Sequence, residues 1–302
     1  MSVLDLFEEK DVVKVCAPMV RYSKQAFRHL VRSYGCDIAY TPMIISESFV
    51  QSKKARDVEF TTNAEDRPLI VQFAASKPKD FADAAEMVKP YSDGVGLNCG
   101  CPQRWAMAEG YGSYLMEHGE LVKDIVLQTK QRVGFEFPCE VKIRIHKDSR
   151  KTIEFCQRAE RAGADWITVH GRTPKERKEP VHYDVIKLIK ESIGIPVVAN
   201  GDIKSEEDVL KVKELTNVDG VMAAQGMLNN PAMYAGYDIT PMQCVEDWMD
   251  IALRLGTPFR TFHHHLMYMT DSWHTKSERM VFNNLSSVPA VLNFLEVHYG
   301  IT

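Results

Sequence analysis

The chain has 302 residues, 45% of them apolar, and a formal net charge of −4 at pH 7. This is enough apolar material for one large core with a small appended domain, and the acidic balance argues against a generic polyanion-binding protein. No apolar run approaches the roughly 18 to 20 residues of a bilayer span, and the first residues lack the basic flank and apolar stretch of a signal peptide. We therefore expect no membrane association, and cytoplasmic localisation with the nucleus as a further compartment.

Eight short apolar runs, rich in β-branched residues, recur along the chain, and each is followed by a helix-like pattern. Most are continuously apolar rather than alternating, which is typical of parallel strands buried on both faces. Eight such units predict an α/β fold, a (β/α)8 TIM barrel. The predicted strands are residues 12–19, 37–43, 68–75, 94–100, 139–145, 166–172, 196–202 and 220–226.

The intervals between the strands carry helix signals, such as Ser205 followed by three acidic residues at a predicted helix start. The widest interval follows the fourth strand, where a barrel would place it as a loop over the active face. After residue 237 the strand–helix alternation stops and helical patterns continue. The sequence therefore predicts a barrel domain over residues 1–236 and a small all-helical domain over residues 237–302.

In barrels of this class the reactive side chains lie at the carboxyl ends of the strands. Lys142 is the most informative, because a lysine within an apolar strand is costly to bury unless it meets an anion or an acceptor. A strand-end lysine that reaches solvent is the alternative, and for His170 the alternative is a satisfied core histidine. The polar residues at the predicted strand ends are Gln72, Asn98, Cys101, Lys142, Arg144, His170, Arg172, Asn200, Asp202 and Gln225.

Two glycines, Gly201 and Gly226, stand just beyond the seventh and eighth predicted strands. Glycine there lets backbone N–H groups approach an anion, and phosphate sites of these barrels are usually built at this place. The positions predict a site for the phosphate of a nucleotide-like cofactor. Ordinary turn glycines are the alternative.

Seven cysteines, an odd number without a framework spacing, predict reduced thiols rather than disulfides. Two of them lie in NCGCPQRWAMAEG, residues 98–110. A metal site at Cys99 and Cys101 would want two further ligands, and the nearby His118 falls in no recognisable ligand spacing. A redox pair normally has a two-residue gap. We therefore expect no metal, a packed Cys99, a working thiol at Cys101 and a lid over residues 102–112 with glycine hinges.

Positive charge is concentrated between Lys142 and Lys178, where eleven Lys and Arg residues face five Asp and Glu residues. Such a segment can raise the local density of an anionic partner even on an acidic protein. Solvated helix and loop faces are the alternative.

The motifs together resemble the tRNA-dihydrouridine synthases, flavin mononucleotide (FMN) enzymes that reduce uridine in tRNA. The similarity runs essentially end to end and is strongest to the short eukaryotic type that acts at positions 20a and 20b. NCGCP, VKIR and VHGR at these strand ends form a specific combination, whereas one motif alone would not. The stretches that carry it are APMVRYSKQAFR, TPMI, VQFAA, LNCGCPQRWAMAEGYGS, VKIRI, VHGRT and VVANGDI.

The resemblance implies a role for individual residues. On the substrate side, Asn98 would contact the uracil, Cys101 would donate a proton to it, and Arg144 would lie beside it. The implied cofactor-binding residues are Pro18, Met19, Gln72, Lys142, His170, Asn200, Gly201, Asp202, Gln225 and Gly226.

The implied reaction is reduction of the uracil C5=C6 bond in the tRNA D-loop, with NADPH as the reductant. A hydride from reduced flavin would reach C6, and Cys101 would give a proton to C5. A thiol suits this role because its ordinary pKa of about 8.5 keeps it protonated at neutral pH yet able to release the proton. Lys142 would stabilise the negative charge of the reduced ring.

A uridine in folded tRNA must be extruded before it can react, and phosphate contacts can offset that cost. We expect such contacts from the loops after strands five and six, with Arg172, Lys175 and Lys178 among them. The tail, predicted to recognise tRNA, carries four Lys and Arg against seven Asp and Glu residues. It would contact a small part of the tRNA or buttress the barrel, and its histidine run, residues 263–265, is predicted to be an exposed helix face rather than a metal site.

One departure from the family pattern is Gln225, where relatives usually have arginine. Backbone donors survive that exchange, so flavin binding is expected to persist. Two alternatives remain open: a non-catalytic tRNA-binding factor that keeps the barrel, and a flavin oxidoreductase of free pyrimidines. Nothing in the sequence points to an obligate protein partner.

Overall fold

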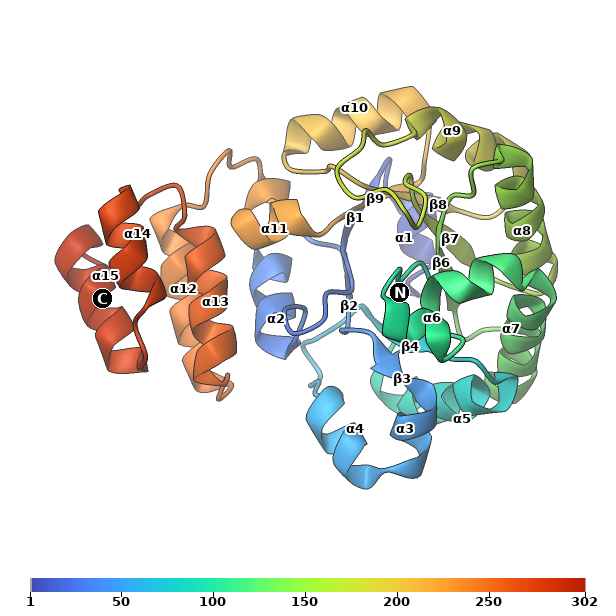
Figure 1. Ribbon diagram of the computed structural model, residues 1–302, viewed down its shortest axis with the longest axis horizontal. Coiled ribbons are helices and arrows are strands. Elements are labelled where there is room, and N and C mark those ends of the chain that lie inside the picture. Colours follow the sequence, from blue (N-terminus) through green and yellow to red (C-terminus); the bar gives the residue numbers. More distant parts are fainter. Residues whose placement is uncertain (1, 302) are drawn as a thin grey trace.

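The computed structural model describes residues 2–301, and its centre is a closed barrel of parallel strands (Figure 1). The sheet runs in the order β2-β1-β9-β8-β7-β6-β5-β4-β3, and pairing of β2 with β4 closes it. The predicted (β/α)8 barrel is confirmed. Its strands are β1 (Val13–Cys16), β2 (Ile38–Tyr40), β4 (Leu69–Ala74), β5 (Gly94–Cys99), β6 (Cys139–Arg144), β7 (Trp166–His170), β8 (Val197–Asn200) and β9 (Gly220–Ala223).

The second predicted strand, residues 37–43, is shorter than expected. It ends at Tyr40, and a separate two-residue strand, β3 (Ile44–Ile45), pairs with the end of β4. Pro42 lies between the two segments and has no N–H to donate to a strand ladder, which accounts for the interruption. The chain there turns outward into α3 (Ser46–Gln51) and α4 (Lys53–Glu59).

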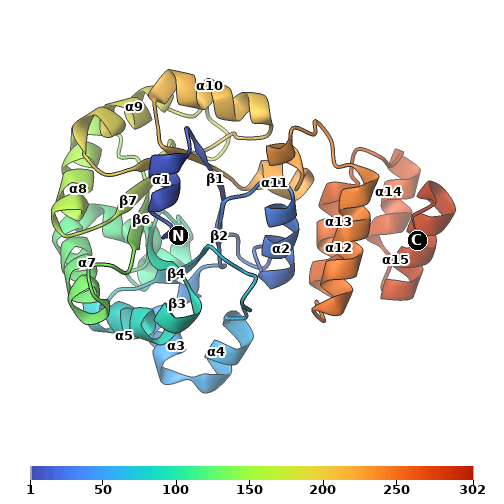
Figure 2. The ribbon, with the colours of Figure 1, turned by 180° about the vertical axis from the view of Figure 1, so that it is seen from behind.

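Helices surround the barrel on its outside, as the alternating pattern predicts (Figures 1 and 2). Local capping fixes several of their starts: the Ser205 side chain accepts a hydrogen bond from the Asp208 N–H at 3.2 Å. The remaining helices of this part are α2 (Gln25–Ser33), α5 (Pro78–Val88), α6 (Arg104–Ala108), α7 (Gly119–Val133), α8 (Ser149–Arg161), α9 (Tyr183–Ser192), α10 (Glu206–Thr216) and α11 (Gln225–Asn229), with 3-10 turns at Lys89–Tyr91, Gly112–Glu117 and Met233–Ala235.

Helix α1 (Asp5–Glu9) lies across the end of the barrel that is seen from behind (Figure 2). The ring of Phe7 on α1 is 5.8 Å from that of Trp166 at the start of β7. The amino-terminal end of the barrel is therefore covered, and ligands have access from the carboxyl ends of the strands.

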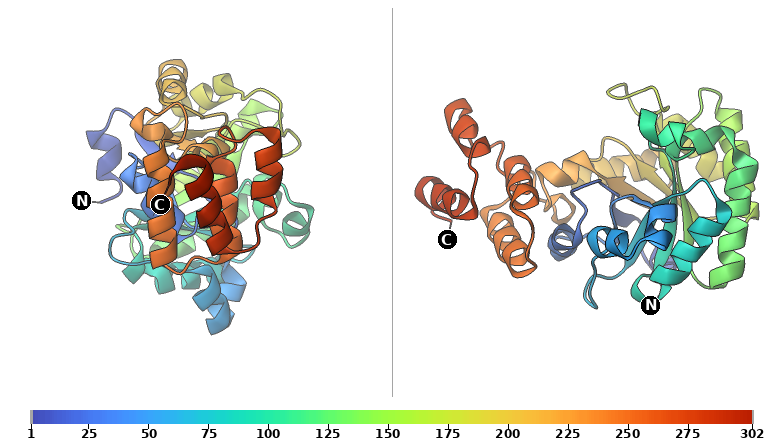
Figure 3. Two further views of the ribbon diagram at one scale, coloured as in Figure 1. Left: turned by 90° about the vertical axis from the view of Figure 1, so that its left-hand side faces the viewer. Right: turned by 60° about the horizontal axis from the view of Figure 1, so that its bottom comes forward.

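Four helices after residue 241 stand together beside the barrel (Figures 1 and 3): α12 (Met242–Arg254), α13 (Phe259–Met269), α14 (Lys276–Asn283) and α15 (Val288–Tyr299). They share buried aromatic side chains, including Trp248, Phe262 and Phe282. The contact with the barrel is made chiefly by α12 against α2, where the Tyr34 hydroxyl donates to Asp247 at 2.6 Å. None of the helices within residues 2–301 is long and apolar enough to cross a membrane.

The histidine run contradicts the expectation of an exposed helix face. His263 is 4% exposed and His265 is fully buried, and only His264 reaches the surface in part. His265 stacks on Phe27 of α2 with ring centroids 4.4 Å apart, and its Nε2 lies 3.1 Å from the Tyr22 carbonyl oxygen. The run is buried because α13 packs between α12, α14 and the barrel, and the sequence pattern of one helix does not reveal such packing.

Candidate active site

A cavity of about 820 Å³ opens at the carboxyl ends of the strands. Two predicted site residues do not line it: Met19 packs into the hydrophobic core, and Lys175 is exposed outside the cavity. Val20, Met43 and Lys204 line it although they were not among the predicted site residues, and Arg177, from the basic loop expected to contact tRNA, lines it as well. The predicted residues that it brings together are Pro18, Gln72, Asn98, Cys101, Lys142, Arg144, His170, Arg172, Lys178, Asn200, Gly201, Asp202, Gln225 and Gly226.

Lys142 extends from β6 into this cavity, and its position is fixed by Asn200 at the end of β8. Lys142 Nζ donates to Asn200 Oδ1 at 2.9 Å, while Asn200 Nδ2 donates to the Met222 carbonyl at 2.8 Å. Burial lowers the pKa of Lys142, and the nearby Glu140 opposes that shift. The amine is therefore held in place beneath any ligand that enters.

Glu140 lies one strand repeat below Lys142 and was not predicted from the sequence. Its side chain is fully buried, and neither carboxylate oxygen has a hydrogen-bond partner in the described part of the chain. Gly96 makes room for it, since a Cβ at Gly96 would lie 2.4 Å from Glu140 Oε2. Burial raises the pKa of Glu140 to about 8. The signal was available, because alternation in CEVKIR places residues 140, 142 and 144 on one face of the strand.

Asn98 and Gln72 form a buried pair behind the thiol loop. Asn98 Nδ2 donates to Gln72 Oε1 at 2.8 Å, and Asn98 Oδ1 accepts from the backbone N–H of Cys101 at 2.9 Å. Asn98 therefore fixes the path of the backbone from the end of β5 to Cys101. The remaining polar atom, Gln72 Nε2, is buried without a partner in the described part of the chain. An orphaned donor of this kind inside a ligand cavity fits an acceptor on a bound ring.

Cys101 is the half-exposed thiol at the edge of the cavity, whereas Cys99 is fully buried. The segment after it returns across the same loop: the Ser113 N–H donates to the Cys101 carbonyl at 2.9 Å. Helix α6 covers this side of the barrel mouth (Figure 1), and Trp105 on it is 49% exposed. Gly110 and Gly112, which flank the turn after α6, both have positive φ angles, 79° and 62°.

Two glycines allow the backbone to close in at the other side of the cavity. A Cβ at Gly226 would lie 2.3 Å from the Ile203 carbonyl oxygen, so the loop after β8 touches the start of α11. Gly201 has φ +130°, and its carbonyl accepts from the Tyr183 hydroxyl at 2.8 Å. The side chain of Gln225 turns along its own helix, where Nε2 donates to Asn229 Oδ1 at 2.9 Å.

The cavity is strongly cationic. The single carboxylate among the described residues that line it, Asp202, is ion-paired with Arg172 at 2.6 Å. His170 adds no charge near neutral pH, because burial and then the neighbouring Lys142 lower its pKa to about 2. An anionic ligand is therefore favoured. The cationic residues that line the cavity are Lys142, Arg144, Arg172, Arg177, Lys178 and Lys204.

Arg144 and Arg172 are less free than the exposed lysines. Arg144 Nε donates to the Gly100 carbonyl at 3.0 Å and its Nη1 to the Thr173 carbonyl at 3.0 Å. Arg172, 6% exposed, bonds the Glu179 carbonyl as well as Asp202. Both guanidinium groups therefore hold the loops of the cavity in shape. Within residues 2–301 no cluster of three or more His, Cys, Asp or Glu side chains is placed to hold a metal ion.

Comparison with known proteins shows which family this chain resembles. The sequence profile described as "Dihydrouridine synthase (Dus)" matches residues 15–290. The chain is 56% identical over 299 residues to the human protein named tRNA-dihydrouridine(20a/20b) synthase (NAD(P)+)-like, covering 99% of this chain and 94% of that one. It is 44% identical over 302 residues to the Schizosaccharomyces pombe protein named tRNA-dihydrouridine(20a/20b) synthase (NAD(P)+), covering 100% and 92% of the two chains.

Solved structures support the fold at much lower sequence identity. The old yellow enzyme from Trypanosoma cruzi superposes with a TM-score of 0.53 at 9% identity, over 72% of this chain and 85% of that one. Histamine dehydrogenase from Rhizobium superposes with a TM-score of 0.54 at 12% identity, over 79% and 48%. The profile match over most of the chain, together with these near full-length identities, shows that the chain belongs to the dihydrouridine synthase family.

Proposed function

We propose that this protein is an FMN-dependent tRNA-dihydrouridine synthase that reduces uridine at position 20a or 20b of the D-loop, with NADPH as the reductant. The observation that carries the proposal is one cavity in which a half-exposed thiol, Cys101, and a buried amine, Lys142, meet a cationic lining. Near full-length identity to relatives named for this reaction supports it.

The residues present fit FMN. The orphaned Gln72 Nε2 and the amine of Lys142 would bond the polar edge of the flavin ring, and Pro18 and Val20 give apolar surface beside them. The backbone at Gly201 and Gly226, with the arginines and lysines of the rim, would hold the ribityl phosphate. When bound, FMN supplies the hydride that C6 of the uracil receives.

The chain itself supplies the proton and the orientation. Cys101 gives its proton to C5, and solvent then restores the thiol, so that uridine, NADPH and one proton yield dihydrouridine and NADP+. Asn98 holds the loop that carries Cys101, and Arg144 bonds the carbonyl of Gly100 just before it. Lys142 places a cationic donor where negative charge develops.

The test is mapping of dihydrouridine in tRNA taken from cells that lack this protein, after incubation with the purified holoenzyme and NADPH. The wild type should form dihydrouridine at position 20a or 20b. Cys101→Ala should keep its bound flavin but form the product about 10² to 10⁴ times more slowly. Cys99→Ala, the same change at a buried thiol of the same motif, serves as the matched control and should stay active.

Absence of product from a flavin-loaded wild type that binds tRNA would favour the non-catalytic tRNA-binding factor. Reduction of free uridine at the rate seen with tRNA would favour the oxidoreductase of free pyrimidines.

A further inference from the structure

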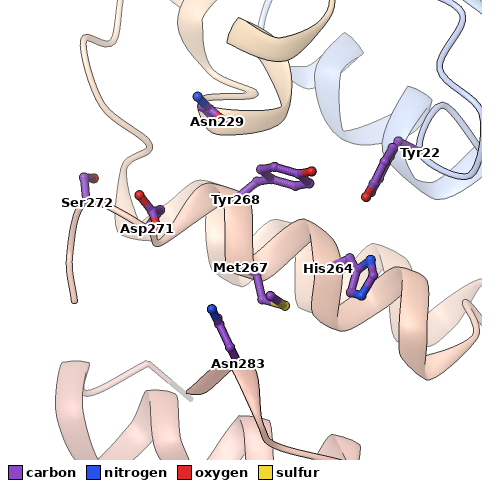
Figure 4. Close-up of a pocket in the computed structure, with 8 residues that line it drawn as sticks. All are labelled: Tyr22, Asn229, His264, Met267, Tyr268, Asp271, Ser272 and Asn283. Atoms are coloured by element: carbon purple, nitrogen blue, oxygen red, sulfur yellow. The ribbon is translucent and has the colours of Figure 1, made fainter. Parts of the chain in front are cut away.

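A second cavity, of about 490 Å³, lies where the barrel meets the helical group. Tyr22, in the loop after β1, and Asn229, the last residue of α11, form its barrel side. Helix α13, the segment that follows it and the last residue of α14 form the other side (Figure 4). The residues on that side are His264, Met267, Tyr268, Asp271, Ser272 and Asn283. We call this space the seam cavity.

Aromatic rings of the seam cavity come from both parts of the molecule. The rings of Tyr22 and Tyr268 are 5.5 Å apart at an interplanar angle of 79°, and those of Tyr22 and His264 are 6.5 Å apart at 29°. Figure 4 shows Tyr268 projecting from α13 toward the barrel, between Asn229 and Tyr22. Flat rings of this kind are stacking surfaces for nucleobases of any sequence.

Polar groups with unused hydrogen-bonding capacity surround the rings. Within residues 2–301, no side-chain hydrogen bond engages His264, Ser272 or Asn283. Together they offer an imidazole, a hydroxyl and an amide at the edge of a stacked ring. The seam cavity therefore combines stacking surface with groups that can bond a base edge, unlike a purely apolar gap between packed domains.

Two arginines lie beside the seam cavity, whose acidic lining residue, Asp271, is ion-paired with Arg279 at 2.9 Å. Arg21 and Arg260 are both exposed, and neither forms an ion pair within the described chain. Neither lines the cavity, but Arg21 immediately precedes Tyr22 and Arg260 lies one turn before His264 on α13; after burial, the larger cause, both lower the pKa of His264. Arg21 also has φ +72°, an uncommon conformation for a residue with a side chain. Free arginines beside stacking rings are suited to a nucleotide with its phosphate.

Two segments of the chain, the loop after β1 and helix α11, each line both the seam cavity and the active-site cavity. In the loop after β1, Pro18 and Val20 line the active site and Tyr22 lines the seam cavity. In α11, Gln225 lines the active site and Asn229 lines the seam cavity, and their side chains are hydrogen-bonded. Four residues of helix span about 6 Å. The two cavities are therefore close enough to receive neighbouring nucleotides of one strand.

We infer that the seam cavity binds the tRNA nucleotide next to the uridine that enters the active site. Its base stacks on the face of Tyr268 with the Tyr22 ring against its edge, and Arg21 and Arg260 contact the flanking phosphate. The inference rests on the proposed function for the identity of the substrate. It gives the junction between the two domains a direct part in holding the extruded segment, beyond support of the barrel.

The test measures tRNA binding by FMN-loaded wild type and Tyr268→Ala. Three tRNAs are compared: the intact tRNA, one with an abasic residue just before the reduced uridine, and one with an abasic residue just after it. If the wild type forms no dihydrouridine, so that no reduced uridine is known, the abasic residues are placed on either side of position 20a. Tyr268→Ala should weaken binding of intact tRNA about 5- to 150-fold. With one of the two abasic tRNAs, wild type and variant should bind alike, because the stacked base is already missing.

A second pair of variants keeps the inference testable if Tyr268→Ala does not fold. Asn283→Trp fills the cavity from an exposed position and should also weaken binding of intact tRNA, whereas Asn284→Trp, exposed beside it and outside the cavity, should not. Equal affinity of wild type, Tyr268→Ala and Asn283→Trp for intact tRNA would overturn the inference. So would a weakening that persists undiminished with both abasic tRNAs.

Failure of the inference is distinguishable from failure of the proposed function. Dihydrouridine formation by wild type with no effect of the cavity variants contradicts only the inference. No dihydrouridine from wild type, with the abasic pattern intact in binding, contradicts only the proposed reaction.

Discussion

Gly112 lies so close to Cys101 that a Cβ on the glycine would be 2.5 Å from the Cys101 carbonyl oxygen and 2.8 Å from its Cβ. The turn after the lid helix is therefore pressed against the loop that carries the thiol, and only glycine fits. Its φ of +62° adds a second reason for glycine at this position.

We expect Gly112→Ala to displace Cys101 and to slow dihydrouridine formation by about tenfold to a hundredfold, because shifts of about 1 Å at a reacting group have effects of that size. Single-turnover rates on tRNA measure it. Gly110→Ala is the matched control: it has the same backbone cost at φ +79°, but its Cβ would meet the Ser76 side chain at 3.2 Å rather than the thiol loop. Equal rates for the two variants would contradict a positioning role of Gly112.

Lys142→Met should weaken FMN binding and slow reduction of the bound flavin by NADPH. The variant removes the donor that Asn200 orients at 2.9 Å, and loss of one such donor commonly costs about 10² to 10³ in rate. Flavin fluorescence gives the affinity and stopped-flow absorbance gives the rate. Lys204→Met, at an exposed position of the same cavity, should change both by far less; a similar loss would point to a general charge effect.

Glu140→Gln should change how the stability of the apoprotein depends on pH. Burial raises the pKa of Glu140 to about 8, so between its ordinary value of about 4.3 and that value the folded protein retains a proton that the unfolded chain releases. The wild-type free energy of unfolding therefore falls, through this group, as pH rises across that range. Glutamine does not titrate, so Glu140→Gln should gain stability relative to wild type from pH 5 to pH 8.

Denaturant unfolding at several pH values measures this difference, with the exposed Glu191→Gln as control. The lowered pKa of Lys142 acts in the opposite sense, making stability rise with pH as it titrates, which is the reason to stop at pH 8. A difference between wild type and Glu140→Gln that stays constant with pH would show that the carboxyl is ionised throughout.

Charge reversal at Lys175 and Lys178 should weaken tRNA binding and reduce its dependence on salt. Both side chains are exposed in the loop after β7. For each phosphate that the variant no longer neutralises, the slope of log affinity against log salt should fall by about 0.9 for a duplex region and about 0.7 for a single strand. Binding titrations at several salt concentrations test this. Lys211→Glu, exposed on α10, is the control, and an equal effect there would indicate only long-range attraction.

The sequence was most informative about the barrel, because continuous apolar runs such as LIVQFA in β4 follow from burial on both faces. It was less informative where side chains from distant segments meet. Asp202 lines the cavity, but the pairing of its carboxylate with Arg172, thirty residues earlier, was not predicted. Met19 was expected beside the ring, yet the local turn directs it into the core, and Val20 lines the cavity.

Other misses also have a physical cause. The buried histidines of α13 depend on packing between helices, which a single amphipathic pattern cannot reveal. Glu140 was not predicted although strand alternation places it with Lys142, because the candidates were the polar residues at the strand ends and Glu140 is the second residue of β6. The seam cavity depends on how the helical group docks on α2, and nothing in the local sequence predicts that geometry.

The cysteines of this protein differ sharply in their accessibility to reagents. Within residues 2–301 six cysteines are buried, and Cys101 alone is half-exposed. Alkylating reagents that act on accessible thiols should thus modify one site on the native chain, and that site is the proposed proton donor. A single labelling event would therefore report occupancy of the reaction centre, and the same exposure makes the protein sensitive to electrophiles.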